Sequence, residues 1–438
     1  MTRTVEEHQQ AVLGLLRYSS GFADRPADTL PLAAARGRVL GEDVHAPVSL
    51  PPFDNSQMDG YAVHGADLAH GNGSLHLTVA SPVPAGAVPE PLKPGSAAPI
   101  MTGAMIPEGA AAVVPIERAE PSQFPTPSQY RGQHELTVEL PLVEEGLFIR
   151  GEGSDLEAGS VALTAGAVLG PAQLGLLAAC GLSEVRVRPK FLVLLLTTGD
   201  EVQEPGGPLG PGRIFDANTT LLQTALEDAG ASVRRHSVLT DDPDELRSAL
   251  KSVGGGVNLI LSTGGISKGA YEVVKQALED SSVEFLSVAM QPGGPQAIGT
   301  IDGVPFLGFP GNPVSALVSF EMFLRPALAV VAGIPGNRVC LTARLAEDIQ
   351  SPENKHQVRR GIYIDRSGQG EGIGTATVQG GAGSHLLHAL ASSNALLHFP
   401  VGTGALEAGA PIAVWLLDEL RGGIQPTHPS NPNREAYP

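Results

Sequence analysis

Phe191-Leu-Val-Leu-Leu-Leu196 is an unbroken apolar run, and Thr197-Thr-Gly-Asp-Glu201 follows it directly. Continuous apolar runs that end in a polar turn are typical of strands buried on both faces of a sheet. Strand and helix patterns then alternate along the chain, which predicts a doubly wound parallel sheet. The expected strands are 191–196, 233–239, 257–261, 283–288 and 304–309, and the expected helices are 219–228, 243–251, 271–278 and 313–331.

Four polar loops follow strands of this sheet, at the edge where doubly wound sheets bind ligands. They are 197–201, 240–242, 262–269 and 309–313. Gly-rich turns before helices present backbone N–H groups, which suit a phosphate or another oxyanion. The loops also carry carboxylates, and carboxylates beside an anion imply a hard cation, for which Mg²⁺ is the best candidate. These carboxylates are Asp200, Glu201, Asp241, Asp242 and Glu272.

Simpler interpretations of the same loops stay open. Glycines after strands are common, and no loop here matches GxGxxG or GxxxxGK[ST]. Asp242 is more readily explained as a helix cap. Glu272 is equally well explained as a first-turn acid favoured by the helix dipole. The joint occurrence of the four loops on one sheet edge favours a binding site.

Residues 50–63 (LPPFDNSQMDGYAV) have neither helical nor strand periodicity. They place Asp54, Asn55, Ser56 and Asp59 within six positions. An Asx turn followed by a β-turn explains this segment as well as a functional site does. Residues 99–107 (PIMTGAMIP) place Thr102 between apolar flanks, for which a hairpin turn is the simpler interpretation.

The flanking regions have other patterns. Residues 5–16 have the spacing of an amphipathic helix, with Thr4 and Glu7 placed for a capping box. Residues 61–141 and 339–417 consist of short apolar alternations between Gly and Pro turns, which predict a β-rich unit and a small barrel or sandwich. The polar, Pro-rich residues 422–438 predict a disordered tail.

Composition narrows the class of protein. The 438 residues include 46 acidic and 28 basic side chains, for a net charge of −18, and 42% are hydrophobic. These values favour folded domains and argue against nucleic-acid binding, which needs clustered Lys and Arg. The longest apolar stretch, 316–334, contains Glu321 and Arg325, so we expect a buried helix and no membrane span. A polar start and two isolated cysteines favour a cytoplasmic setting.

Another candidate anion contact lies near the C-terminus. Residues 380–385 (GGAGSH) form a Gly-rich loop, and Arg359 and Arg360 lie upstream of it. The planar guanidinium fork of arginine suits oxyanions. Two adjacent arginines are nevertheless more often a solvated surface pair.

Together these motifs resemble the molybdopterin molybdotransferase family, which includes the E-domain of gephyrin. The most specific match is PPFDNSQMDGYAV at residues 51–63. The resemblance extends from about Val5 to Leu417, with the motifs in the family's order. The supporting matches are Met101–Ala104, Arg150 with Gly153 and Asp155, Thr198–Glu201, Gly264–Ser267 and Pro310–Ser315.

The resemblance implies a function and an architecture. Family members insert molybdate into adenylylated molybdopterin, with Mg²⁺-dependent release of AMP, in the last step of molybdenum-cofactor synthesis. The implied domains are an elongated discontinuous domain (1–50 and 142–187), a β-rich insert (51–141), a doubly wound pterin-nucleotide domain (188–332) and a C-terminal β-barrel (333–421). The family also implies a homodimer, with Asp59 and Thr102 facing the sheet loops of the other subunit. A molybdopterin adenylyltransferase or a molybdoenzyme is a further candidate partner.

The same resemblance implies a role for each matching residue. The catalytic set is Asp59, Thr102, Glu201, Asp242 and Glu272, and the Mg²⁺ set is Asp59, Asp200, Glu201 and Asp242. The substrate-binding set is Asp155, Thr198, Gly199, Gly264, Gly265, Ser267, Pro310, Gly311, Asn312, Pro313 and Ser315. The molybdate set is Gln291, Arg359, Arg360 and Ser384.

One segment departs from the family pattern. Where members commonly have Met-Lys-Pro-Gly-Lys-Pro, residues 290–295 are Met-Gln-Pro-Gly-Gly-Pro. The loss of two cations should weaken oxyanion binding, although Gln291 can donate a hydrogen bond and Lys268 or the two arginines can compensate. This loss keeps open a non-catalytic carrier or scaffold that binds molybdopterin. The adenylyltransferase step is a third interpretation, and residues 51–63 and the extra domains argue against it.

Overall fold

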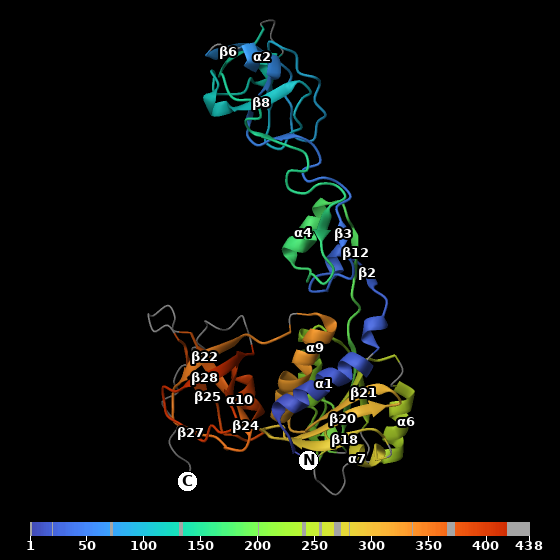
Figure 1. Ribbon diagram of the computed structural model, residues 1–438. Helices are drawn as coiled ribbons and strands as arrows, with labels where there is room; N and C mark the ends of the chain where they lie inside the picture. Colours follow the sequence, from blue (N-terminus) through green and yellow to red (C-terminus); the bar gives the residue numbers. More distant parts are fainter. Residues whose placement is uncertain are drawn as a thin grey trace. The chain divides into compact units, whose positions relative to one another are not determined.

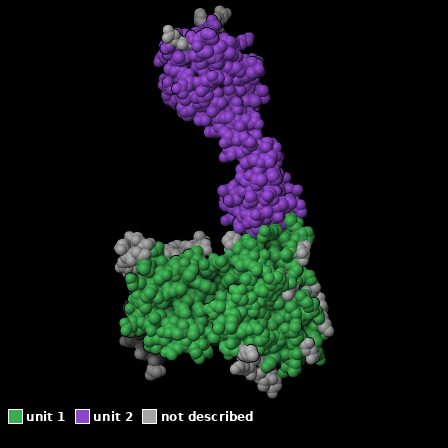
Figure 2. Space-filling model, in the orientation of Figure 1, with its two compact units in different colours: residues 1–28, 188–438 green, residues 29–187 purple. Residues whose placement is uncertain are grey.

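The structure is a computed structural model that describes residues 2–19, 21–70, 73–130, 135–199, 201–238, 242–253, 256–266, 273–279, 281–334, 336–365 and 373–417. The chain divides into two compact units (Figure 2). Residues 1–28 and 188–438 form the sheet-and-barrel unit, and residues 29–187 form the β-rich unit. The predicted tail and the predicted site residues Asp200, Ser267 and Glu272 lie outside the described residues.

A seven-stranded sheet organises the sheet-and-barrel unit (Figure 1). Its strand order is β1 (Thr2–Arg3), β18 (Glu284–Val288), β20 (Pro295–Ile301), β21 (Val304–Phe309), β17 (Leu259–Thr263), β13 (Leu192–Thr198) and β16 (Ser232–Val238). The neighbours β21, β17, β13 and β16 are parallel, as predicted for a doubly wound sheet.

The other part of the sheet contains an antiparallel strand, β20, which was not expected from the sequence. Strand β20 pairs with β21 and β18 in antiparallel register. Asp302 and Gly303 join β20 to β21, and both have positive φ, at 48° and 83°. A two-residue turn with positive φ at both positions matches the twist of a β-hairpin, and Asp-Gly is a favoured pair there. The Asp-Gly pair between two apolar runs was therefore the sequence signal for this hairpin.

Two cores cover the two faces of the sheet. Alternate residues of β13 divide between them: Val193 and Leu195 belong to one core, and Leu194 and Leu196 to the other. This division explains why the strand is apolar at every position. The first core lies under α1 (Val5–Ser19), α5 (Asn218–Asp228) and α8 (Pro313–Ser319), and the second under α6 (Pro243–Val253) and α7 (Val273–Ala277).

Helix α8 continues through a π-helical segment, η4 (Phe320–Leu324), into α9 (Arg325–Ala332). By length and composition, Pro313–Ala332 could cross a membrane, but 72% of its most apolar window is buried inside the protein. Phe320, Phe323 and Leu324 all belong to the first core. The segment is therefore a core helix, as its internal Glu321 and Arg325 indicated.

The first 28 residues differ from the predicted domain assignment. They cluster with residues 188–438, although we expected them in the elongated domain. Helix α1 buries Val12 and Leu16 in the first core, and β1 pairs with β18. The predicted capping box forms, because Glu7 N donates to Thr4 Oγ1 at 3.1 Å and Thr4 N donates to Glu7 Oε2 at 2.8 Å.

Five strands close the predicted barrel: β24 (His356–Ile364), β25 (Thr375–Val378), β22 (Cys340–Leu345), β28 (Pro411–Leu416) and β26 (Ala395–Phe399), which pairs back with β24. Helix α10 (Leu387–Ala391) precedes β26. The two-residue strand β19 (Met290–Gln291) leaves the sheet region and pairs in parallel with β24. It places residues 290–295 beside the barrel.

The β-rich unit contains a five-stranded sheet of order β8 (Ala110–Pro115), β5 (Gly60–His64), β7 (Ser96–Ile100), β6 (Ser74–Val79) and β9 (Thr137–Pro141). Strand β5 lies between β7 and β8, so the hairpin considered for residues 99–107 does not form. Segments before and after this sheet also pair. Strand β2 (Asp28–Pro31) joins β12 (Glu184–Val187), β3 (Val44–His45) joins β11 (Val161–Leu163), and α4 (Pro171–Ala179) follows β11.

Candidate functional site

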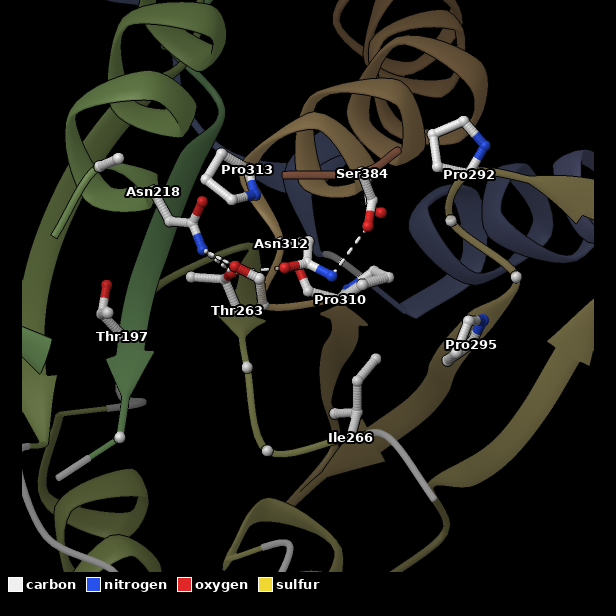
Figure 3. Close-up of a pocket in the computed structure, with 18 of the residues that line it drawn as sticks. Thr197, Asn218, Thr263, Ile266, Pro292, Pro295, Pro310, Asn312, Pro313 and Ser384 are labelled. Carbon is white, nitrogen blue, oxygen red and sulfur yellow. Dashed lines mark hydrogen bonds between the residues drawn. The ribbon is translucent and has the colours of Figure 1, made fainter. Parts of the chain in front are cut away.

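A cavity of about 870 Å³ opens at the carboxyl ends of β13, β17 and β21 (Figure 3). Three of the four predicted loops line the cavity on the side of the sheet, and residues of the barrel line it on another side. The lining residues are Thr197–Gly199, Glu201, Val202, Ile214–Asn218, Thr263–Ile266, Ser287, Val288, Met290–Pro295, Pro310–Pro313, Ser315, Lys355 and Ala382–Ser384.

Glycines let the three sheet loops approach closely. Gly264 and Gly265 have φ of 89° and 65°, and a Cβ on Gly265 would lie 2.7 Å from Val274 Cγ2. A Cβ on Gly311 would lie 3.3 Å from the Cα of Gly264. A side chain at Gly265 would therefore clash with α7. Glycines among the lining residues of these loops carry no side chain, which suits a ligand that binds to backbone N–H groups, such as an anion.

Two asparagines hold the loops in place. Asn218 Nδ2 donates to Thr263 Oγ1 at 3.0 Å and to the Gly311 carbonyl at 2.6 Å (Figure 3). Asn312 Nδ2 donates to Ser384 Oγ at 2.9 Å, across from the sheet to the barrel. Because Ser384 Oγ accepts this bond, its own O–H can donate to a ligand.

Among the described residues, two carboxylates line the cavity, and the hydrogen bonds of one of them are used within the fold. Asp216 accepts from Thr219 N at 2.9 Å and from Thr219 Oγ1 at 2.6 Å, so it caps the start of α5. The Glu201 carboxylate lies against Gly199, with no hydrogen-bond or ion-pair partner among the described residues. Within the described ranges, no group of three or more His, Cys, Asp or Glu side chains could hold a metal ion.

Lys355 is the one basic side chain among the described residues that line the cavity. It precedes β24 and is exposed. The turn at residues 290–295 lies on the same wall. Gln296 supports this turn, because its Nε2 donates to the Gly293 carbonyl at 2.7 Å and to Ser319 Oγ at 2.8 Å.

Most of the described site residues predicted in this unit line the cavity. They are Thr198, Gly199, Glu201, Gly264, Gly265, Gln291, Pro310, Gly311, Asn312, Pro313, Ser315 and Ser384. Asp242, Arg359 and Arg360 do not line it. Asp242 Oδ1 accepts from Asp244 N at 2.8 Å at the start of α6, in agreement with the helix-cap interpretation.

Arg359 and Arg360 donate their hydrogen bonds to other groups of the protein and not into the cavity. Arg360 is buried, and it donates to the carbonyl of Gly381 and, at 3.0 Å, to that of Gly383. It therefore shapes the Gly-rich loop that carries Ser384. Arg359 Nε donates to Gln357 Oε1 at 2.9 Å, and its Nη2 to the Gln350 carbonyl at 3.0 Å. Burial lowers the pKa of both guanidinium groups below its ordinary value.

In the β-rich unit the structure brings Asp59 and Thr102 together. Thr102 N and Thr102 Oγ1 donate to Asp59 Oδ1 at 2.6 and 2.8 Å. These bonds, led by the backbone amide, lower the pKa of the exposed Asp59 carboxyl below its usual 3.8. Gly60, the next residue, allows β8 to approach β5 closely, because a Cβ there would lie 2.0 Å from the Val114 carbonyl oxygen. Asp155 is exposed in the same unit.

Several lining residues escaped the sequence analysis. Asp216 follows the two-residue strand β15 (Ile214–Phe215), which was not expected, and Thr263 lies in the predicted loop 262–269 but had no role assigned to it. Lys355 carried no local signal, since it stands in a polar turn far from the sheet in sequence. Only the parallel pairing of β19 with β24 brings it to the cavity.

Comparisons with known proteins agree with this architecture. Residues 3–181 match the model of the MoeA N-terminal region (domain I and II), residues 194–330 that of a probable molybdopterin binding domain, and residues 342–417 that of the MoeA C-terminal region (domain IV). Molybdopterin molybdenumtransferase 2 of Mycobacterium tuberculosis is 42% identical over 424 residues, which cover 94% of this chain and 99% of the relative. The chain belongs to the MoeA family.

Other members of the MoeA family support the assignment. The molybdopterin molybdenumtransferase of Haemophilus influenzae is 35% identical, over 90% of this chain and 94% of its own. A crystal structure of the molybdopterin biosynthesis MoeA protein from Pyrococcus horikoshii has a TM-score of 0.76 and 27% identity, covering 95% of this chain and 100% of its own. The multidomain fold, with its doubly wound sheet and C-terminal barrel, is thus a MoeA fold.

Proposed function

We propose that this chain is an enzyme, a molybdopterin molybdenumtransferase that inserts molybdate into adenylylated molybdopterin and releases AMP. The observation that carries the proposal is the cavity at the sheet edge, where the Gly-rich loops and the residues expected at the substrate converge. Curated relatives that match this chain over most of its length are named for the same transfer. Because these relatives are named as transferases, the comparison does not favour a non-catalytic carrier.

The loops of the sheet would bind the substrate's phosphates. Backbone N–H groups around Gly199, Gly265 and Gly311 can donate to phosphoryl oxygens in the cavity. Asn312 and Ser384 would fix the distance between the sheet loops and the barrel loop. The substrate would then be held between two walls, with its phosphates on the sheet side.

Mg²⁺ would bind beside these phosphates. The donor set fits the ion, because Glu201 presents a carboxylate on the cavity wall, and Mg²⁺ commonly takes one or two carboxylates together with substrate phosphates. Asp200, and Asp59 of the partner subunit, would complete the ligands. When bound, the ion neutralises phosphoryl charge and so eases loss of AMP. Thr102 would keep Asp59 ionised and correctly oriented.

Molybdate would enter on the barrel side. Lys355, Gln291 and Ser384 lie on that wall and can all donate hydrogen bonds to an oxyanion. Lys355 would supply the positive charge that the family commonly places in the segment equivalent to 290–295. The site would therefore keep one cation and neutral donors in place of the two lysines.

The active assembly would be a homodimer in the cytoplasm. The family resemblance implies that Asp59 and Thr102 of one subunit act at the cavity of the other. The two cysteines are free thiols, which suits a reducing compartment. A measured mass of a single chain in solution would argue against the shared site.

The test is release of AMP from adenylylated molybdopterin by the purified full chain. Release should require both Mg²⁺ and molybdate, and it should fall sharply in Asp59→Asn. Tight binding of the adenylylated pterin without release, even at high molybdate, would contradict the enzyme and support the carrier. Consumption of ATP with molybdopterin would instead indicate the adenylyltransferase step.

A further inference from the structure

Three side chains on the barrel wall form a hydrogen-bonded chain that ends at the cavity. Arg359 Nε donates to Gln357 Oε1 at 2.9 Å, and Gln357 Nε2 donates to Gln291 Oε1 at 2.8 Å. Gln357 and Gln291 face each other in the register of β24 and β19. Gln357 is buried, at 2% exposure, and Gln291 lines the cavity.

The direction of this chain follows from chemistry alone. A guanidinium group has N–H donors and no acceptor, so the atom of Gln357 that faces Arg359 must be its carbonyl oxygen. The NH₂ group of Gln357 must then face Gln291, which has to accept with Oε1. The assignment of oxygen and nitrogen in both amides is therefore fixed by the arginine, although the two atoms look alike in shape.

The consequence appears at Gln291. Its Oε1 is occupied by Gln357, and its Nε2 has no hydrogen-bond partner among the described residues. We propose that Arg359 acts through Gln357 as a positioning residue, which makes Gln291 present an N–H donor and not its carbonyl oxygen to an oxyanion in the cavity. A freely rotating glutamine could offer either group, and the carbonyl would repel the anion.

This inference changes the role expected for Arg359. The family resemblance implied that Arg359 contacts molybdate, but its donors go to Gln357 and to the Gln350 carbonyl. Its charge is half-buried behind the cavity wall. In the MoeA family a lysine at the position of Gln291 is a donor in any orientation. A glutamine is a reliable donor only if a neighbour fixes its amide.

The experiment measures molybdate binding to the full chain by titration calorimetry. In Gln357→Glu the new carboxylate still accepts from Arg359 but cannot donate to Gln291. The Gln291 amide should then turn its NH₂ toward this carboxylate and its oxygen toward the cavity. Because a hydrogen bond to a charged group is lost, the Kd for molybdate should rise by about tenfold or more.

Two further variants separate positioning from general damage. In the Gln291→Lys variant, the lysine has N–H donors and no acceptor, so it cannot turn an acceptor toward the cavity. Adding Gln357→Glu to this variant should therefore change the Kd for molybdate far less than adding it to the native chain. Arg359→Lys keeps a donor and should preserve binding better than Arg359→Met. The KM for adenylylated molybdopterin and the melting temperature should change little in Gln357→Glu, which a purely structural role would not predict.

The outcomes are distinct. Equal molybdate affinity in the native chain and in Gln357→Glu, or an equal loss in the Gln291→Lys background, would overturn the relay. So would a native chain that binds no molybdate. The inference rests on the proposed function only for the identity of the oxyanion. If the native chain binds molybdate but releases no AMP, the proposed function fails, while the relay is still supported by the expected ratios of Kd.

Discussion

Thr102 donates two hydrogen bonds, from its backbone amide and its hydroxyl, to the same carboxylate oxygen of Asp59, at 2.6 and 2.8 Å. The two residues are 43 positions apart, and the family resemblance grouped them without indicating that they bond to each other. The pair leaves Asp59 Oδ2 available, within the described part of the chain, for a ligand.

The first prediction concerns this pair. Thr102→Val removes the hydroxyl and keeps the amide, so the pKa of Asp59 should rise toward 3.8 without reaching it. A titration followed by NMR of the carboxyl carbons measures the shift. Thr102→Ser keeps both donors and serves as the control. Asp59→Asn should lower AMP release by about tenfold or more, since a charge-assisted contact is lost.

The second prediction concerns the cation at the cavity. Lys355→Met should raise the KM for molybdate by about tenfold or more, because the described lining has no other basic side chain. Gly294→Lys should lower it, since a Cβ at Gly294 has no contact closer than 3.4 Å. Steady-state AMP release measures both. The exposed Lys190 provides the control substitution, Lys190→Met, and a similar rise there would refute a local role.

The third prediction concerns the bond between Asn312 and Ser384. Asn312→Ala and Ser384→Ala should each raise the KM for adenylylated molybdopterin. The double variant should lose less binding free energy than the two single variants lose together. The shared hydrogen bond should appear as a coupling free energy of about 0.5–1.5 kcal/mol. Strictly additive effects would show that the two side chains act independently, contrary to the 2.9 Å contact.

The fourth prediction concerns a buried ion-pair network. Glu321 is fully buried; Arg338 Nε and Nη2 donate to it at 3.0 and 2.8 Å, and Arg325 Nε lies 2.9 Å from it. Arg338 Nη1 also donates to the Leu417 carbonyl at 2.7 Å, which ties the barrel to η4. Glu321→Ala leaves Arg325 and Arg338 without their carboxylate partner, so the free energy of unfolding should fall by about 3–5 kcal/mol. Urea unfolding measures this loss.

The control for that network is a surface pair in the same unit. Asp244 pairs with Arg247 on α6, where the two side chains are 86% and 41% exposed. Asp244→Ala should change the free energy of unfolding by at most about 1 kcal/mol, because solvent screens the pair. A comparable loss in the two variants would contradict the importance of burial at Glu321.

The fifth prediction concerns acid sensitivity. Burial, with a smaller contribution from Arg3, lowers the pKa of His8 from 6.5 to about 4. Neither ring nitrogen has a partner among the described residues, and the ring packs edge-on against Phe323 at 4.6 Å. Between pH 6.5 and 4 the unfolded chain therefore binds a proton that the folded chain does not, so stability falls as the pH falls.

His8→Phe should remove this loss. Its advantage in free energy of unfolding over the native chain should grow by roughly 2 kcal/mol between pH 7 and pH 5. Urea unfolding at the two pH values measures it. His388→Phe, at a position in the same unit that is not buried, should show no such growth. An advantage that does not depend on pH would mean that His8 does not titrate as its burial requires.

The sequence indicated the elements that local rules control. Apolar runs such as 191–196 predicted buried strands because a strand covered on both faces has no polar position. Thr4 and Glu7 predicted a helix start, because a capping box involves only neighbours. The hairpin at Asp302 and Gly303 was also available from the sequence, since positive φ at both positions favours this pair.

The site divided in the same way. Gly264, Gly265 and Gly311 were predictable, because strand ends in a parallel sheet meet at one edge and glycine permits the close approach. Lys355, and the part played by Arg359, were not predictable. Each depends on the pairing of β19 with β24, in which a two-residue strand joins segments more than 60 positions apart.

By itself, then, the sequence determined the family, the layered sheet, the barrel and the loops that carry the chemistry, because these follow from periodicity, turn chemistry and motif order. The tertiary structure alone decided which of the charged residues face the cavity. Arg360 and Arg359 turned inward to satisfy carbonyls and an amide, and Lys355 remained on the wall. Side-chain direction depends on hydrogen-bond partners supplied by distant segments, and no local pattern in the chain encodes those partners.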